Sequence, residues 1–101
     1  MTRFATKYGA FEIDSLPSQP QIAVCHAFFV REEMRGKSLG HKLKAHQADV
    51  LNELQYDYAI CTCKGENITQ QRVLESAGWT HLDTFASSNT GGLIQLWGKQ
   101  S

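Results

Sequence analysis

Apolar and polar residues alternate along several short segments of the chain, as they do in β-strands. The pattern predicts strands over residues 11–16, 21–30 and 58–63, followed by a hairpin of residues 80–86 and 92–98. Residues 17–20 contain two prolines, which cannot continue a strand ladder, so a turn is expected between the first two strands. The turn of the last hairpin is predicted over residues 87–91, which are small and polar and end in glycine.

Two segments carry apolar residues at helical spacing. In residues 40–54, the apolar positions are Leu43, Val50, Leu51 and Leu54, with Leu39 one turn ahead. Residues 67–77 predict a second helix, with Asn67 as its N-cap and Gly78 as its C-terminal stop. Together, the elements predict one α+β domain over residues 1–101, with a mixed, mostly antiparallel sheet flanked by two helices.

The strand over residues 21–30 has apolar residues on both faces. One predicted face carries Ile22, Val24, His26, Phe28 and Val30, and the other carries Ala23, Cys25, Ala27 and Phe29. A strand of this kind is expected at the centre of a sheet that is covered on both sides.

Composition and charge narrow the class of protein. The chain has 101 residues, of which 42% are hydrophobic and 20% charged, as in an ordinary globular domain. The formal net charge is zero, so we expect no nucleic-acid partner and no attraction to acidic membranes. Three cysteines, an odd number, give no disulfide framework and favour a reduced, cytoplasmic protein. We expect neither a secretory signal nor a bilayer-spanning segment.

Residues 35–40, Arg-Gly-Lys-Ser-Leu-Gly, join the strand over residues 21–30 to the first predicted helix. A tight turn of this kind presents free backbone N–H groups at a helix N-terminus, which is a site for a phosphate. The right-handed crossover of the strand-helix-strand unit places the turn at the carboxyl edge of the sheet, where ligands bind. Five of the ten Lys and Arg residues lie around it: Arg31, Arg35, Lys37, Lys42 and Lys44. They are either solvated surface charges or, as we favour beside such a turn, a local field for an anion.

The spacing of the glycines excludes two common nucleotide loops. A Walker loop needs glycine five residues before its Gly-Lys-Ser, and Arg31 occupies that position. A dinucleotide fingerprint needs three spaced glycines, and only Gly36 and Gly40 are present in this turn. The turn is therefore expected to hold a different phosphorylated cofactor.

The turn resembles the acyl-CoA loop of the Gcn5-related N-acetyltransferases, which has Arg or Gln, two residues, Gly, one residue, then Gly or Ala. Arg35, Ser38 and Gly40 occupy these places, with Ser38 where the family usually has glycine. The preceding strand resembles the family's fourth strand, which splays from its neighbour. Downstream, Asn67 and the run at residues 77–79, Ala-Gly-Trp, resemble the family's later helix, so the similarity covers roughly residues 21–98.

The resemblance implies a cofactor and a set of contacts. Acetyl-CoA is the implied cosubstrate, and an amine, on a small molecule or a protein, is the implied acceptor. The resemblance implies that the backbone of Phe28 and Val30 pairs with pantetheine and that Asn67 contacts the pantetheine arm. The residues implied around the pyrophosphate are Arg35, Gly36, Lys37, Ser38, Leu39 and Gly40. Arg35 and Lys37 are alternatively exposed turn charges.

Catalysis is less clearly indicated than binding. Transfer to an amine is often helped by a base, and an acid returns a proton to the departing thiolate. Many family members use a tyrosine seven residues after the Asn, where this chain has Leu74, which cannot donate a proton. Either another group acts, or the CoA thiolate leaves without an acid, or the protein does not catalyse.

His26 is the candidate base, because imidazole titrates near neutral pH and some amine acetyltransferases of the family place a histidine in this relation to the loop. The alternative is a partly buried structural histidine. Cys25 is expected in the core. No metal site is expected, since Cys61 and Cys63 lie two apart on one strand without a second ligand pair.

The sequence indicates least about how the acceptor amine would be bound. Typical members wall the acceptor groove with an N-terminal strand and two helices, whereas only about twenty residues precede Gln21 here, so we expect the N-terminal helices to be missing. A second subunit in a homodimer could supply the missing wall. Such a dimer would also cover the apolar residues near the C-terminus, Phe85, Leu93, Leu96 and Trp97. Alternatively, these residues form the core of the last hairpin. Two functions stay open: an acetyl-CoA-dependent N-acetyltransferase, and a catalytically degenerate module of this fold that binds CoA or a protein.

Overall fold

The structure is a computed structural model that describes residues 2–101. Six strands form one sheet in the order β1-β2-β3-β4-β6-β5. The strands are β1 (Thr2–Ala5), β2 (Gly9–Leu16), β3 (Gln19–Val30), β4 (Tyr58–Lys64), β5 (Thr80–Ala86) and β6 (Leu93–Gln100). Neighbouring strands run antiparallel except β3 and β4, which are parallel. The expected α+β fold with a mixed, mostly antiparallel sheet is confirmed.

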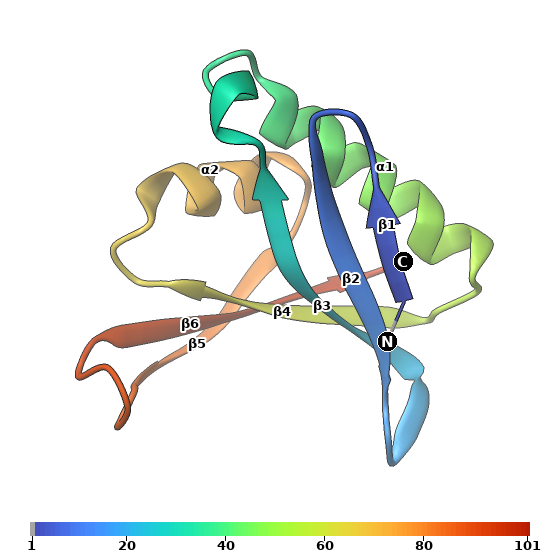
Figure 1. Cartoon of the computed structure of the whole chain (residues 1–101). Coiled ribbons are helices and arrows are strands. Elements are labelled where there is room, and N and C mark those ends of the chain that lie inside the picture. Colours follow the sequence, from blue (N-terminus) through green and yellow to red (C-terminus); the bar gives the residue numbers. More distant parts are fainter. Residues whose placement is uncertain (1) are drawn as a thin grey trace.

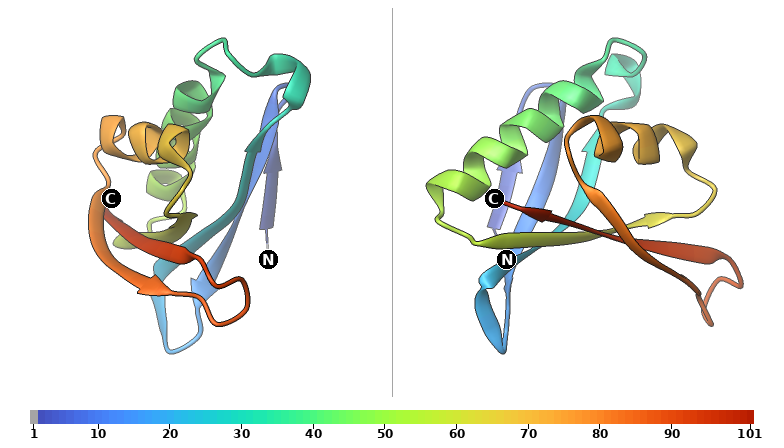
Figure 2. Two further views of the ribbon diagram at one scale, coloured as in Figure 1. Left: turned by 90° about the vertical axis from the view of Figure 1, so that its left-hand side faces the viewer. Right: turned by 180° about the vertical axis from the view of Figure 1, so that it is seen from behind.

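Two α-helices, α1 (Leu39–Glu53) and α2 (Ile68–Ser76), lie side by side on one face of the curved sheet (Figures 1 and 2). A short 3-10 helix, η1 (Glu32–Met34), precedes α1. Within residues 2–101 the other face of the sheet is not covered by a helix. The expectation that the third strand is covered on both sides is therefore wrong: Ala23 and Cys25 are buried beneath the helices, whereas Ile22 and Val24 on the open face are only half-buried.

The hydrophobic core lies between the two helices and the sheet. From α1, Leu43 and Leu51 are fully buried. Residues eight apart are separated by about 80° around a helix, so both side chains lie within one broad apolar stripe. They meet Phe11 of β2 and Leu74 of α2, each 0% exposed. Burying such side chains stabilises the fold by about 1.5–3 kcal/mol each before entropic costs.

The N-terminal region differs most from the prediction. Strand β1, which was not predicted, pairs antiparallel with β2, and β2 begins at Gly9, two residues earlier than expected. The predicted turn over residues 17–20 is only Pro17 and Ser18, since Leu16 already pairs with Gln19. The later elements agree with the prediction to within two residues.

A β-bulge at Ala27 changes which side chains share a face of β3. Ala27 has a positive φ of 53°, and the β2–β3 register shifts by one residue between the Glu12–His26 and Ala10–Phe29 pairs. After the bulge, Phe28 packs on the helix side with the core, as Cys25 does before it. The prediction that His26 shares a face with Phe28 is therefore wrong.

Strands β3 and β4 pair over a short distance and then separate. Their parallel ladder joins Ile22, Ala23 and Val24 to Tyr58, Ala59 and Ile60. Beyond this ladder β3 rises toward the N-terminus of α1 while β4 continues along β6 (Figure 1). The splayed strand implied by the family resemblance is present. No helix within residues 2–101 has the length and apolar character needed to cross a membrane.

Candidate cofactor site

The connection from β3 to α1 is an exposed turn at the upper edge of the molecule in Figure 1. Gly36 has a φ of 82°, and Ser38, the residue before α1, also has left-handed backbone angles, φ 58° and ψ 20°. Helix α1 begins at Leu39, so the first N–H groups of the helix point into this turn without partners inside the helix. The positive end of the helix dipole lies at the same place, which favours an anion.

The acyl-CoA loop that this turn resembles usually has glycine at the position of Ser38, and the left-handed backbone angles of Ser38 give a reason for that preference. A side chain with a β-carbon is strained in this region, by about 1–2 kcal/mol, whereas glycine is not. Ser38 also makes no side-chain hydrogen bond to cap α1. Its presence therefore costs stability without adding a cap.

Arg35 holds the turn against the end of β3. Its Nε donates a hydrogen bond of 3.0 Å to the backbone carbonyl of Val30. The family resemblance implies that the backbone of Val30 pairs with pantetheine. The contact with Arg35 occupies one lone pair of the Val30 carbonyl and leaves the other available. Arg35 thus orders the loop, while Lys37 projects from it as an exposed cation.

Gly40 lies where the two helices approach each other. A β-carbon added at Gly40 would lie 3.6 Å from Cγ2 of Val73 on α2, an ordinary contact distance. Across from it, Asn67 caps α2: its Oδ1 accepts a hydrogen bond of 3.1 Å from the backbone N–H of Gln70. The predicted N-cap is confirmed, and the predicted contact of Asn67 with pantetheine stays a prediction.

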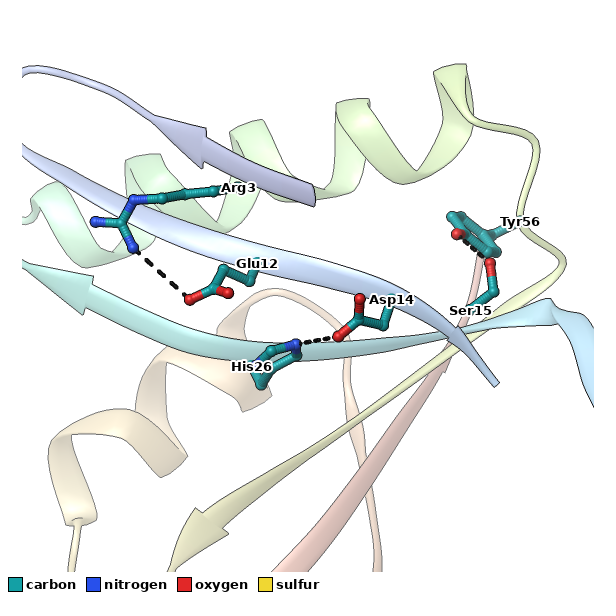
Figure 3. Close-up of polar contacts among 6 residues, drawn as sticks. All are labelled: Arg3, Glu12, Asp14, Ser15, His26 and Tyr56. Carbon is teal, nitrogen blue, oxygen red and sulfur yellow. Dashed lines mark hydrogen bonds and ion pairs between the residues drawn. The ribbon is translucent and has the colours of Figure 1, made fainter. Parts of the chain in front are cut away.

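His26 lies on the open face of the sheet, beside the split between β3 and β4. It is the first residue on that face of β3 beyond Val24, the last position paired with β4. Nε2 of His26 is 2.6 Å from Oδ2 of Asp14 on β2 (Figure 3). Because an ionised carboxylate only accepts hydrogen bonds, Nε2 carries the proton and Nδ1 is the nitrogen that can take another.

A second polar pair extends the same face of the sheet. Nη1 of Arg3 on β1 lies 3.7 Å from Oε2 of Glu12 on β2 (Figure 3). Glu12 in turn lies opposite His26 in the β2–β3 pairing. The side chains of His26 and Asp14 are 37% and 34% exposed. These groups therefore face solvent on the side that α1 and α2 leave open.

Lys44 lies inside the protein and not in the exposed basic group around the turn. The residue is 2% exposed, and its Nζ lies 4.6 Å from the ring centroid of Phe28 and 4.5 Å from that of Trp79. Burial lowers the pKa of the Lys44 ammonium. Lys44 was expected among the charges of a local anion field or among solvated surface charges, and its burial removes it from the exposed charges around the turn. The helical spacing does indicate the burial of Lys44, because Lys44 is seven residues before the core residue Leu51 and lies on the same face of α1.

The three cysteines are free and buried under the helices. Burial raises the pKa of Cys25 to about 12 and that of Cys61 to about 11, and it also raises the pKa of Cys63. These thiols are therefore protonated at neutral pH. In the described part of the chain, no cluster of three or more His, Cys, Asp or Glu side chains could hold a metal ion.

Leu74 is completely buried in the core, so the position of the usual tyrosine carries no proton donor. Two cavities lie elsewhere, one of about 130 Å³ beside the C-terminal half of α1 and one of about 400 Å³ between Gly65 and Leu93. Neither borders the turn at residues 35–40. The candidate site is thus an exposed loop and an adjoining split in the sheet.

Comparison with solved structures shows that the chain has the fold of the Gcn5-related N-acetyltransferases. Three solved structures illustrate the similarity. A Gcn5-related N-acetyltransferase from Kribbella flavida matches with a TM-score of 0.82 and 14% identity, over 93% of this chain and 60% of that protein. The ribosomal-protein-S18-alanine N-acetyltransferase from Escherichia coli matches with a TM-score of 0.80 and 12% identity, over 98% and 68%. A Bacillus subtilis acetyltransferase in complex with CoA matches with a TM-score of 0.78 and 12% identity, over 97% and 73%.

The chain is shorter than the proteins that share its fold, spanning 63% of one further acetyltransferase and 59% of another. No protein-family model matches the sequence, and no curated protein matches it significantly. The similarity is therefore one of structure.

Proposed function

We propose that the protein is an N-acetyltransferase that uses acetyl-CoA and transfers the acetyl group to an amine. The observation that carries this proposal is the joint placement of two features: an anion-binding type of turn at the start of α1, and strand edges that separate next to it. A cofactor with a phosphate end and an extended amide-containing arm fits both. Similar structures solved with CoA support the choice.

In the proposed pose, the N–H groups of residues 36–40 bind the pyrophosphate, and Lys37 adds a nearby positive charge. The pantetheine arm lies in the split between β3 and β4, along backbone groups that β4 does not pair beyond Val24. Phe28 and Val30 border this part of β3, and Asn67 lies at the start of α2 on the other side. The arm would thus continue the sheet where the two strands part.

The acceptor amine is proposed to approach from the open face of the sheet, because α1 and α2 cover the other face. His26 stands on that open face next to the split, held by Asp14. A base at this place would accept a proton from the amine through Nδ1. His26 is thus proposed as the base although it lies on the opposite face of β3 from Phe28.

A second function is favoured by one observation. Leu74 is fully buried, and no tyrosine takes its place at the usual position in the later helix. A protein that binds CoA or another protein without turnover would need no acid there. The two functions differ in turnover.

The test is release of free CoA thiol from acetyl-CoA in the presence of a panel of amines that includes aminoglycosides, polyamines and peptide N-termini. An aminoglycoside acetyltransferase with the same fold was solved with CoA and kanamycin, which is the reason for the first class. Amine-dependent thiol release supports the acetyltransferase. Binding of acetyl-CoA without amine-dependent release across the panel supports the binding module.

The remaining features of the proposal concern the setting of the protein. We propose a single domain over residues 1–101, a reducing, cytoplasmic location that suits its three free thiols, and a homodimer. The homodimer is supported by Phe85, 47% exposed, and Leu93, 58% exposed, on adjacent strands; Trp97 of the same hairpin is instead part of the core. Light scattering across a range of protein concentrations tests the dimer, and a constant monomer mass would contradict it.

A further inference from the structure

Lys44 places a buried amine between two aromatic rings and near the buried thiols. Its Nζ lies 4.6 Å from the ring centroid of Phe28 on β3 and 4.5 Å from that of Trp79, which follows α2. No salt bridge to Lys44 is present within residues 2–101. A long cationic side chain is seldom buried without such a partner unless its position serves a purpose.

The amine lies beside the split in the sheet. Phe28 belongs to the part of β3 that has already separated from β4, because the ladder between the two strands ends at Val24. The charge of Lys44 is also felt by Cys25 on β3 and by Cys61 and Cys63 on β4, so thiols of both diverging strands surround it. The ammonium of Lys99 on β6 is the other charged group that acts on Lys44. The ring of Phe28, which lies beside the amine, thus belongs to the part of β3 that borders the split in which the proposed pantetheine arm would lie.

Burial has opposite effects on the reactivity of the two kinds of nucleophile here. A thiol must lose its proton to attack, and burial raises the pKa of Cys25 to about 12 and of Cys61 to about 11. A lysine must also lose its proton to attack, and burial lowers its pKa, which enlarges the neutral fraction. The two ring faces favour the cation and offset part of this effect. The directions of these pKa changes favour the amine over the thiols of Cys25 and Cys61 as the nucleophile.

We propose that Lys44 is an acyl acceptor within the protein itself, taking the acyl group of a thioester bound in the split between β3 and β4. This inference rests on the proposed binding of acetyl-CoA. In the step, the neutral Nζ attacks the thioester carbonyl, an N–C bond forms, the C–S bond breaks, and the CoA thiolate leaves. The proton lost by nitrogen ends on that thiolate. The products are an amide at Lys44 and free CoA.

Acylation would remove a buried charge and leave an amide in its place. The cost of holding a desolvated cation disappears, so the acylated protein should be more stable than the unmodified one. The nitrogen of the amide product is no longer a nucleophilic amine, so one acetyl group is expected at Lys44 in each chain.

The experiment incubates the full chain with acetyl-CoA, follows the intact mass, and maps the modified residue by peptide mass spectrometry. Hydroxylamine treatment distinguishes an amide, which resists it, from a thioester on Cys25, Cys61 or Cys63, which it cleaves. Acetyl phosphate serves as a donor that lacks the CoA moiety. Lys44→Arg tests the site, and Lys64→Arg, at an exposed lysine of β4, is the matched control.

The expected result is one hydroxylamine-resistant acetyl group on Lys44, formed from acetyl-CoA faster than from acetyl phosphate, lost in Lys44→Arg and kept in Lys64→Arg. Modification confined to surface lysines, or to a thiol, would overturn the inference. Calorimetry in parallel separates the two claims. Binding of acetyl-CoA with Lys44 unmodified overturns the inference alone, whereas absence of binding overturns the proposed function as well.

Discussion

Nε2 of His26 lies 2.6 Å from Oδ2 of Asp14, across the β2–β3 pairing and on the sheet face that the helices leave open. The carboxylate fixes the ring so that Nε2 carries a proton and Nδ1 accepts one. This geometry gives the candidate base both an orientation and an approach path for the acceptor.

The first prediction concerns this pair. His26→Ala should leave the affinity for acetyl-CoA unchanged, because the ring is on the opposite face from Phe28, and should lower amine-dependent turnover about 100-fold, the usual contribution of a positioned base. Asp14→Asn should lower turnover to a lesser degree, since it keeps the imidazole but loses the carboxylate that orients it. Steady-state thiol release and calorimetry measure the two effects. Unchanged turnover in His26→Ala would show that His26 is only structural.

The second prediction uses the strained residue before α1. Ser38→Gly should raise the free energy of unfolding by up to about 1 kcal/mol, because glycine adopts φ 58° without the strain of a β-carbon and its greater freedom in the unfolded chain offsets part of the gain. Gly36→Ala, at φ 82°, is the matched opposite change and should destabilise by a similar amount. Urea unfolding measures both. Equal stabilities for Ser38→Gly and the natural protein would mean that the turn is not held left-handed.

The third prediction follows from the buried ammonium. Lys44→Met removes a desolvated charge that has no salt bridge in residues 2–101 and should stabilise the protein at neutral pH by about 1–3 kcal/mol. The folded pKa of Lys44 lies below its ordinary value of 10.5, so as pH rises the folded state loses the proton before the unfolded state does. The penalty is complete below the folded pKa and disappears as pH rises toward 10.5.

The stability difference between Lys44→Met and the natural protein should therefore shrink as pH is raised. The three thiols also interact with the Lys44 ammonium, so the comparison is made below their ordinary pKa of 9.0, where the thiols are protonated in both proteins. Denaturant melts at a series of pH values measure the difference. If the difference in unfolding free energy between the two proteins grew with pH, burial would not be destabilising the ammonium relative to the neutral amine.

The fourth prediction concerns Gln47, one turn after Lys44 on α1. Gln47 is 0% exposed, and neither of its side-chain amide atoms has a hydrogen-bond partner within residues 2–101. Gln47→Met keeps the length of the side chain and removes the unpaired polar group, so it should stabilise by about 1–2 kcal/mol. Gln71→Met is the control: it loses a hydrogen bond of 2.9 Å to the carbonyl of Gly65 and should destabilise. Thermal melts that gave both variants the same sign would contradict this account.

Much of the architecture could be predicted because its signals are local. The helical spacing before Leu51, the cap at Asn67 and the two strands of the last hairpin each depend on a few neighbouring residues, and the structure agrees. The bulge at Ala27 could not be predicted, since it depends on how β2 and β3 align and leaves no glycine in the sequence. That one inserted residue is the reason that His26 and Phe28 lie on opposite faces.

The site was predicted less completely than the fold. The turn from Arg35 to Gly40 was found because its glycines and charges are adjacent in sequence. Lys44 was counted among those charges, although its side chain points inward to Phe28 and Trp79, which are far apart in sequence and meet only in the folded protein. Charge patterns along a chain predict where cations gather, and burial decides which of them reach solvent.

Binding of acetyl-CoA at the turn before α1 is tested by calorimetric titration of the natural protein, Gly40→Ala and Gly40→Glu with acetyl-CoA. Gly40 has room for a β-carbon, 3.6 Å from Val73, so both variants should fold. We expect binding by the natural protein and binding within about threefold by Gly40→Ala, a difference of less than about 1 kcal/mol. We expect no detectable binding by Gly40→Glu, whose carboxylate would face the pyrophosphate. Absence of binding by the natural protein, or equal binding by folded Gly40→Glu, would contradict binding of acetyl-CoA at this turn.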